Sequence, residues 1–230
     1  MGQHVLSGNP PLVLRLRQSA RARRISLRIS GLDGKVTLTI PRGVAEREAL
    51  AFAREKEHWL RDQMSRQADQ VQVGLGRDIP VHGIPRRIVS AEGRILSLSE
   101  GEIHVPGDPA TAAARLQAWL RAQARDRLAA ASDHHADRLG LCYARLSIRD
   151  TRSRWGSCSA KGTLMYSWRL IMAPPDVLDY VAAHEVAHLQ EMNHSAAFWA
   201  VVAHLMPAYQ THRKWLRAHG ASLHRFRFAD

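Results

Sequence analysis

The segment HEVAHLQEMNH, residues 184–194, gathers three histidines and two glutamates within eleven residues. His184 and His188 are four residues apart, so on a helix both imidazoles lie on one face and can bind one ion. Glu185 lies one step round the helix, where its carboxylate can hold a metal-bound water without taking a coordination site. Two ligands beside one base are typical of a hydrolytic zinc centre. The segment therefore predicts Zn²⁺ as the cofactor and Glu185 as the general base.

A catalytic zinc site needs a third protein ligand and an open position for water. His194 is the predicted third ligand, because no acidic residue follows Glu191 except the C-terminal one. An unbroken helix would carry His194 roughly 15 Å along its axis from the first histidine, so the chain must turn back. Asn193 tolerates the left-handed conformation and is predicted to end the helix within residues 191–193. Glu191 or another histidine as third ligand is the alternative.

Three further residues are candidates for roles at this centre. Tyr209 is predicted to stabilise the oxyanion, with His212 as a second candidate, because tyrosine and histidine side chains serve this purpose in related chemistry. A packing or surface role for either residue is the alternative. Cys158 could approach the zinc as an inhibitory thiolate, or it could be a small buried side chain.

The elements that position these residues follow from the periodicity of apolar residues. Residues 12–41 predict β structure, with a hairpin around the turn sequence GLDGK. An amphipathic helix is expected over 44–67 and a second β group over 79–105. The sequence PGDP then interrupts the chain, and a long helix follows over 110–138, ending near Gly140.

The C-terminal part is predicted to hold the metal-binding helix, opened by APPD, together with strands and short helices at 144–150, 162–170, 195–205 and 208–219. The strand at 162–168 should offer an open edge on which an extended peptide can add. An internal position for this strand is the alternative. The pattern predicts an α+β fold in two parts, a β-rich region with one helix at 1–109 and a compact core at 110–230.

Composition limits the class of protein. The chain has 230 residues, of which 45% are hydrophobic, enough to bury a substantial core. No run approaches the roughly 18 apolar residues of a membrane helix, and the N-terminus lacks the pattern of a signal peptide. Two cysteines are too few for a disulfide scaffold and fit a reducing compartment. We expect a soluble, cytoplasmic protein with no membrane partner.

The formal net charge of +12 favours a polyanionic partner. Arginines concentrate in three stretches that contain at most one acidic residue each, at 15–28, 145–169 and 213–227. If these stretches share one face, they would contact the phosphates of DNA without reading its sequence. Three separate solvated surfaces are the alternative.

Two segments resemble a known family, the YgjP-type metallopeptidases, which are bacterial zincins. Residues 154–199 carry the resemblance to its signature, with the sequence RWGSCSAKGTLMYSWRLIMAPPDVLDYVAAHEVAHLQEMNHSAAFW. Residues 22–44, ARRISLRIS…GKVTLTIPRGV, resemble the N-terminal part of the family. The resemblance implies a zincin-like core at 110–230, Glu185 as general base, and zinc ligands at His184, His188 and His194. The related Wss-type and Spartan-type proteases digest proteins crosslinked to DNA, a function that the resemblance alone does not transfer.

The residues and the resemblance together predict a zinc-dependent endopeptidase that acts on proteins or peptides, on or near DNA and in DNA repair. Two other functions stay open. A non-enzymatic nucleic-acid-binding protein with a structural zinc would use a fourth protein ligand, such as Cys158. A metal hydrolase acting on a non-peptide bond would use the same centre.

Overall fold

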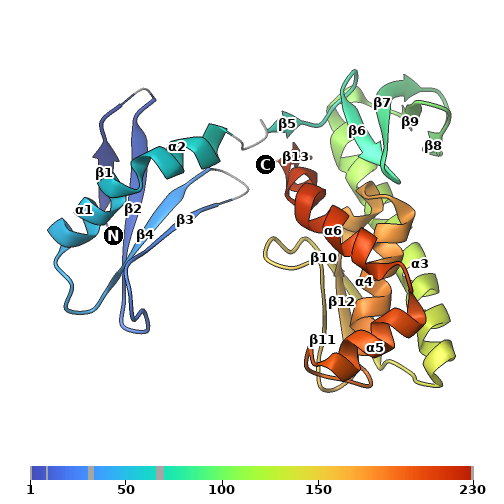
Figure 1. The fold of residues 1–230 in the computed structure, drawn as a ribbon. Coiled ribbons are helices and arrows are strands. Elements are labelled where there is room, and N and C mark those ends of the chain that lie inside the picture. Colours follow the sequence, from blue (N-terminus) through green and yellow to red (C-terminus); the bar gives the residue numbers. More distant parts are fainter. Residues whose placement is uncertain (1, 9, 31–33, 66–69, 229–230) are drawn as a thin grey trace. The chain divides into compact units, whose positions relative to one another are not determined.

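The computed structural model describes the 230-residue chain except for residues 1, 9, 31–33, 66–69 and 229–230. The chain forms two compact units, Met1–Asp69 and Gln70–Asp230, each with its own hydrophobic core (Figure 1). Both units combine helices with strands, in agreement with the predicted α+β class. None of the helices within the described residues is long and apolar enough to cross a bilayer.

The boundary between the units differs from the predicted division into 1–109 and 110–230. Apolar side chains of the second β group, such as Ile88 and Ile103, pack in the same cluster as Leu116 of the following long helix. The alternation of apolar residues predicts the strands of this β group. It does not predict that they pack on the long helix, because that contact joins two different elements. The second β group therefore belongs to the C-terminal unit.

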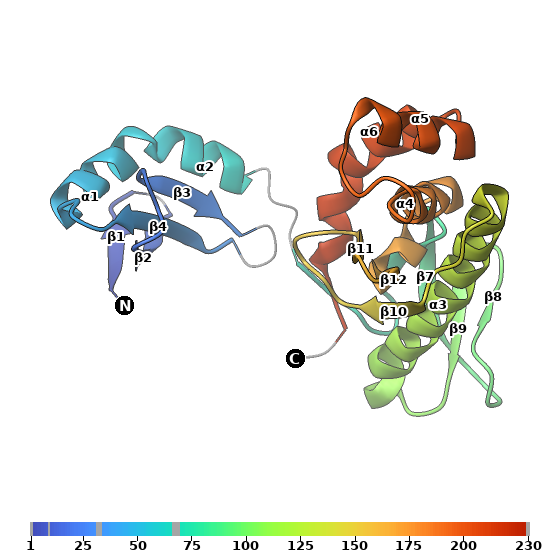
Figure 2. The same ribbon diagram turned by 90° about the horizontal axis from the view of Figure 1, so that it is seen from below.

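The N-terminal unit is a four-stranded sheet in the order β1-β2-β4-β3, covered on one face by two helices (Figure 2). Its elements are β1 (Gln3–Leu6), β2 (Leu12–Ser19), β3 (Ser26–Ile29), β4 (Val36–Pro41), α1 (Glu46–Glu55) and α2 (Glu57–Ser65). Strands β3 and β4 pair antiparallel, which confirms the predicted hairpin, although part of its turn lies outside the described residues. The single helix predicted over 44–67 is divided at Lys56, whose backbone (φ −92°, ψ 8°) leaves the helical region.

Alternation along β2 determines which face of this sheet is buried. Leu12, Leu14 and Leu16 are buried in the core with side chains of α1 and α2, while Arg15 and Arg17 between them are exposed. Since successive side chains of a strand point to opposite faces, the arginines lie on the face away from the helices.

The C-terminal unit carries the predicted metal-binding segment. Its helices and strands are β5 (Val71–Gln72), β6 (Asp78–Val81), β7 (Ile84–Ala91), β8 (Ser97–Leu98), β9 (Glu102–Pro106), α3 (Ala112–Leu139), β10 (Arg145–Arg149), β11 (Gly156–Cys158), β12 (Thr163–Ser167), α4 (Pro175–Ala187), α5 (Ala196–Leu205), α6 (Tyr209–His219) and β13 (Phe226–Arg227). Short 3-10 helices lie at Pro109–Thr111, Trp168–Met172 and Gly220–Arg225. The sheets have the orders β6-β7-β9-β8, β10-β12-β11 and β13-β5.

Helix α3 ends as predicted at Gly140, which adopts the left-handed conformation (φ 66°) that terminates many helices. Its buried face repeats every four residues, through Leu116, Leu120, Ala124 and Leu128, as expected for an amphipathic helix. Helix α4 packs between α3 and the α5–α6 pair (Figure 2), so the predicted metal-binding helix is supported on both sides.

Strand β12 is internal to its sheet, so the predicted open edge at 162–168 is wrong. It pairs in parallel with β10 on one side and antiparallel with β11 on the other. The free edge beside α4 belongs instead to β11. Three residues are too short a strand to show alternation, so the sequence pattern could not indicate β11.

The C-terminal segment is fixed by a buried arginine. Arg169, 6% exposed, donates through Nε and Nη2 to the two carboxylate oxygens of Asp150 (2.8 and 3.2 Å). Its Nη1 donates to the carbonyls of Leu223 and Phe226, each at 3.0 Å. Arg169 therefore serves packing and is not available at the surface, although it lies within the arginine-rich stretch 145–169.

Candidate metal centre

Three imidazoles converge at the end of α4. The side chains of His184, His188 and His194 each offer a ligand atom, and these atoms all lie within 4.8 Å of one another. Nε2 of His184 is 3.1 Å from Nε2 of His194. Nitrogen ligands at 2.0–2.1 Å from one tetrahedral zinc would be about 3.3 Å apart. The donor set and its spacing therefore fit a single metal ion.

The turn that brings the third histidine back begins earlier than expected. Helix α4 ends at Ala187. The carbonyl of Ala187 accepts the backbone N–H groups of Gln190 and Glu191 at 3.1 and 3.0 Å. His188 occupies the helix C-cap with φ −67° and ψ −14°. The chain therefore reverses over 188–191, immediately after the second ligand.

The predicted left-handed break at Asn193 is wrong. Among the described residues, His82 is the one non-glycine with a positive φ. The turn needs no such residue, because the carbonyl at the helix end already closes it. Asn193 instead accepts the backbone N–H of Ser195 through Oδ1 (3.0 Å), and the hydroxyl of Ser195 caps α5 by accepting the N–H of Phe198 (3.4 Å). His194 thus comes from the segment just before α5.

Hydrogen bonding and packing orient the imidazoles. Nδ1 of His188 lies 2.9 Å from the carbonyl oxygen of Glu191, which can only accept, so Nδ1 donates and Nε2 keeps its lone pair for a metal. The buried ring of Phe198 contacts all three imidazoles, with centroid distances of 4.9, 4.4 and 4.8 Å to His184, His188 and His194. Phe198 is a functional neighbour that the sequence reasoning missed.

The environment keeps His184 neutral, which is the form that binds metals. Burial lowers the pKa of His184 to about 3, with smaller contributions from His188, His194 and Arg213. Burial also lowers the pKa of His188. Metal ligation requires deprotonated imidazole nitrogens, so these shifts favour ligation over protonation.

Glu185 is buried beside the imidazoles, with 5% of its surface exposed. Burial raises the pKa of its carboxyl to about 8, opposed by the hydrogen bond from the backbone N–H of Cys158 and by the charge of Arg154. A cation held by the three imidazoles would stabilise the carboxylate and lower this pKa. A carboxylate next to a metal centre can accept a proton from water.

Strand β11 packs against the side chain of Glu185. The carbonyl of Trp155 accepts the N–H of Ser167 at 2.8 Å, and the N–H of Ser159 donates to the carbonyl of Thr163 at 3.0 Å. Alternation along an antiparallel pair then directs the backbone groups of the intervening Gly156 and Cys158 away from β12.

Gly156 leaves room for the carboxylate. A Cβ at this position would lie 2.5 Å from Oε1 and 2.6 Å from Cγ of Glu185, which is closer than atoms can approach. Glycine is therefore required by close approach of a side chain, although its own backbone is unstrained. The glycine of WGSC was the available sequence signal, but its contact lies 29 positions further along the chain.

Tyr209 is separated from the three histidines by the ring of Trp199. It stacks on Trp199 with ring centroids 5.4 Å apart, and Trp199 in turn stacks on His194 at 5.9 Å. The guanidinium of Arg213 lies 4.3 Å from the centroid of the same tryptophan ring. The role of Tyr209 as an oxyanion donor stays a prediction, as does that of His212.

Cys158 is separate from the donor set. The group of potential metal ligands found within the described residues consists of the three histidines without this thiol. Burial and the neighbouring Glu185 raise the pKa of Cys158, which disfavours the thiolate that a metal would need.

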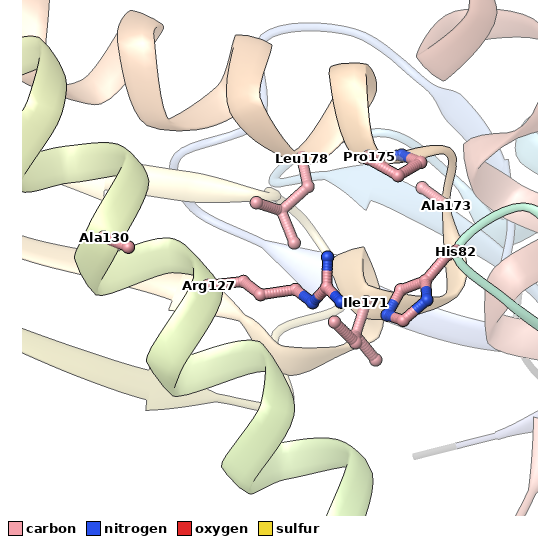
Figure 3. Close-up of a pocket in the computed structure, with 7 residues that line it drawn as sticks. All are labelled: His82, Arg127, Ala130, Ile171, Ala173, Pro175 and Leu178. Atoms are coloured by element: carbon pink, nitrogen blue, oxygen red, sulfur yellow. The ribbon is translucent and has the colours of Figure 1, made fainter. Parts of the chain in front are cut away.

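Two cavities flank α4. One, of about 440 Å³, is lined by His188 and opens next to the donor set. The other, of about 210 Å³, lies near the start of α4 between His82, Arg127 and Leu178 (Figure 3). None of the three histidines lines the second cavity, so of these two the first adjoins the metal centre, through His188.

The fold and the centre define a metallopeptidase with two histidines and a glutamate on one helix. The sequence matches the family model of the YgjP-like metallopeptidase domain over residues 23–219, and the chain belongs to this family. The resemblance stated for residues 22–44 and 154–199 is thereby confirmed.

Comparison with solved structures found the metallopeptidase zymogen abylysin of Pyrococcus abyssi. The match has 24% sequence identity and a TM-score of 0.36, and it covers 40% of this chain and 92% of that chain. Comparison with curated proteins gave no significant match.

Proposed function

We propose that this metallopeptidase is a zinc endopeptidase, with His184, His188 and His194 as ligands and Glu185 as general base. The observation that carries the proposal is the convergence of three imidazoles beside one buried carboxylate. Zinc, when bound, supplies Lewis acidity to the scissile carbonyl and to a water molecule. Three protein ligands leave a position for substrate, as catalytic rather than structural sites do.

The chain's own residues perform the proton transfers. Glu185 accepts a proton from the attacking water and passes it to the leaving amine. The N–H of Cys158 and the close contact with Gly156 hold this carboxylate in one orientation. Fixing the base before substrate arrives lowers the cost of reaching the transition state.

The substrate is proposed to bind as an extended strand along β11. The N–H and carbonyl of Gly156 and the carbonyl of Cys158 point away from β12, and a peptide can add there through main-chain hydrogen bonds, whereas the N–H of Cys158 is used by Glu185. This edge takes the place of the one expected at 162–168. A peptide on it would lie beside Glu185, because Gly156 contacts that side chain.

The metal content and ligand type test this function. A chelator should abolish peptide cleavage, and added zinc should restore it. X-ray absorption of the zinc-loaded protein should show only nitrogen and oxygen ligands, at about 2.0–2.1 Å. A zinc–sulfur distance of about 2.3 Å would instead identify Cys158 as a ligand and favour a closed structural site.

A second proposal is DNA association through the N-terminal sheet. The strand register places Arg15 of β2 and Arg28 of β3 on either side of Thr37 in β4, and Arg17 next to Thr39. These three arginines are exposed, and the two on β2 lie on the face opposite α1 and α2. Neighbouring strands are about 4.8 Å apart, so Arg15 and Arg28 lie about 10 Å apart at the backbone. Such a surface suits phosphate contacts without base readout.

Salt dependence tests DNA association. Replacing Arg15, Arg17 and Arg28 together with alanine should weaken binding and reduce the slope of log K against log salt by about 2–3, because each phosphate contact contributes about 0.9. Fluorescence anisotropy with a duplex at several salt concentrations measures both. The control is alanine at Arg47 and Arg54, which are exposed on α1. An unchanged slope in the triple variant would exclude this sheet as the DNA site.

A further inference from the structure

The side chains that line the cavity of about 440 Å³ beside the metal centre indicate what it can bind. It adjoins the ligand His188, and its apolar lining includes Leu141, Leu189 and Met192. Met192 is 53% exposed, so its apolar surface is accessible from the cavity. A side chain of a bound substrate would cover this surface.

The charge in the cavity comes from one residue. Lys161 is the lysine or arginine that lines it, and none of the lining residues is an acid. One lining residue, Tyr143, donates its hydroxyl hydrogen to the carboxylate of Asp133 at 2.5 Å. Burial, and then this bond, raise the pKa of Tyr143 to about 12, so the phenol stays neutral. The lining residues are therefore mostly apolar and include one lysine.

The backbone around Lys161 is held in place. The N–H of Gly162 donates to the carbonyl of Ser159 at 2.9 Å, and the hydroxyl of Ser159 accepts the N–H of Thr163 at 3.1 Å. The carbonyl of Gly162 also accepts the N–H of Ala144 at 2.9 Å. This turn joins β11 to β12, so the lysine lies at the end of the edge strand along which the substrate is proposed to bind.

Two arginines near the centre are also positively charged. Arg154, just before β11, acts on Glu185, and Arg213 of α6 acts on His184. Neither arginine forms an ion pair among the salt bridges found in the described part of the chain. Lys161 and these two arginines would therefore favour an acidic substrate side chain over a basic one.

We propose that this cavity is the specificity pocket of the peptidase and that it accepts a glutamate side chain next to the scissile bond, paired with Lys161. The inference rests on the proposed peptidase function and names its substrate class. The methylene groups of glutamate pack on Leu189 and Met192 while its carboxylate reaches the ammonium group. Aspartate is shorter and would fill the apolar part less completely.

Peptides that differ at one position test the pocket. Zinc-loaded protein is given matched fluorogenic peptides with Glu, Gln or Lys on either side of the scissile bond. We expect kcat/KM to fall in the order Glu, Gln, Lys, with about tenfold between the extremes, because these two peptides differ by the loss of one attraction and the gain of one repulsion; tenfold corresponds to about 1.4 kcal/mol. Lys161→Glu should invert the order. Lys56→Glu in the N-terminal unit is the charge-matched control and should leave it unchanged.

A binding measurement separates this inference from the proposed function. The zinc-loaded Glu185→Gln variant should bind the Glu peptide more tightly than the Lys peptide, as read by anisotropy without turnover. Higher salt should reduce the difference, because exposed charges are screened. Equal affinities that Lys161→Glu does not change would overturn the pocket assignment and leave the peptidase intact. Preferential binding with no cleavage by the wild type would overturn the peptidase function and leave the pocket.

Discussion

Replacing Glu185 with glutamine is expected to lower kcat about 10²–10⁴-fold, the usual contribution of a general base. The zinc content should stay at one ion per chain, because none of the three imidazole ligands is changed. Glutamine has nearly the same shape as glutamate, so it fits against Gly156, and its carbonyl oxygen can still accept the N–H of Cys158. Activity measured on a fluorogenic peptide, with zinc measured by mass spectrometry, checks both expectations.

The same segment supplies the control for this experiment. Glu191 is the second glutamate of HEVAHLQEMNH, and the contact that it makes to a ligand runs through its backbone carbonyl. Glu191→Gln keeps that carbonyl and should retain nearly wild-type kcat and zinc. Full activity in Glu185→Gln, or loss of activity in Glu191→Gln alone, would show that Glu185 is not the general base.

The contrast between these two glutamates shows what the sequence could predict. The helical spacing places His184, Glu185 and His188 without any knowledge of the fold, because neighbours on a helix are fixed by its geometry. His194 followed by elimination of acidic ligands, and the structure brings its ring to the other two. The sequence does not predict how the chain turns back after α4. Asn193 has the right intrinsic preference, but the hydrogen bonds at the end of α4 close the turn first.

Contacts between distant segments account for the other differences. The apolar alternation of 79–105 predicts strands but not that they pack on α3, so the predicted division of the chain at 109/110 differs from the compact units. Strand pairing is also non-local, so the sequence pattern places β12 at an edge that β11 occupies in the structure. In each case the local pattern gave the element, and tertiary packing decided its neighbours.

The dependence of Glu185 on β11 gives the second large prediction. Gly156→Ala should lower kcat by about 10²-fold, the effect of displacing a catalytic group by about 1 Å. The proposed zinc ligands lie on α4, at its C-terminal cap and before α5, so the metal content should not change. Gly74→Ala is the matched control in the same unit, because a Cβ at Gly74 meets no atom within 4 Å.

A double-mutant cycle distinguishes displacement of the base from general damage to the sheet. Aspartate at position 185 is shorter by one methylene and would retract from the added Cβ of Gly156→Ala. Glu185→Asp should therefore cost much less activity in the Gly156→Ala background than in the wild type, a coupling expected only for residues in contact. Additive losses would mean that Gly156→Ala acts through the fold of β11. A strong coupling would mean that Gly156 leaves the space that the Glu185 side chain occupies. The edge strand would then position the base as well as the substrate.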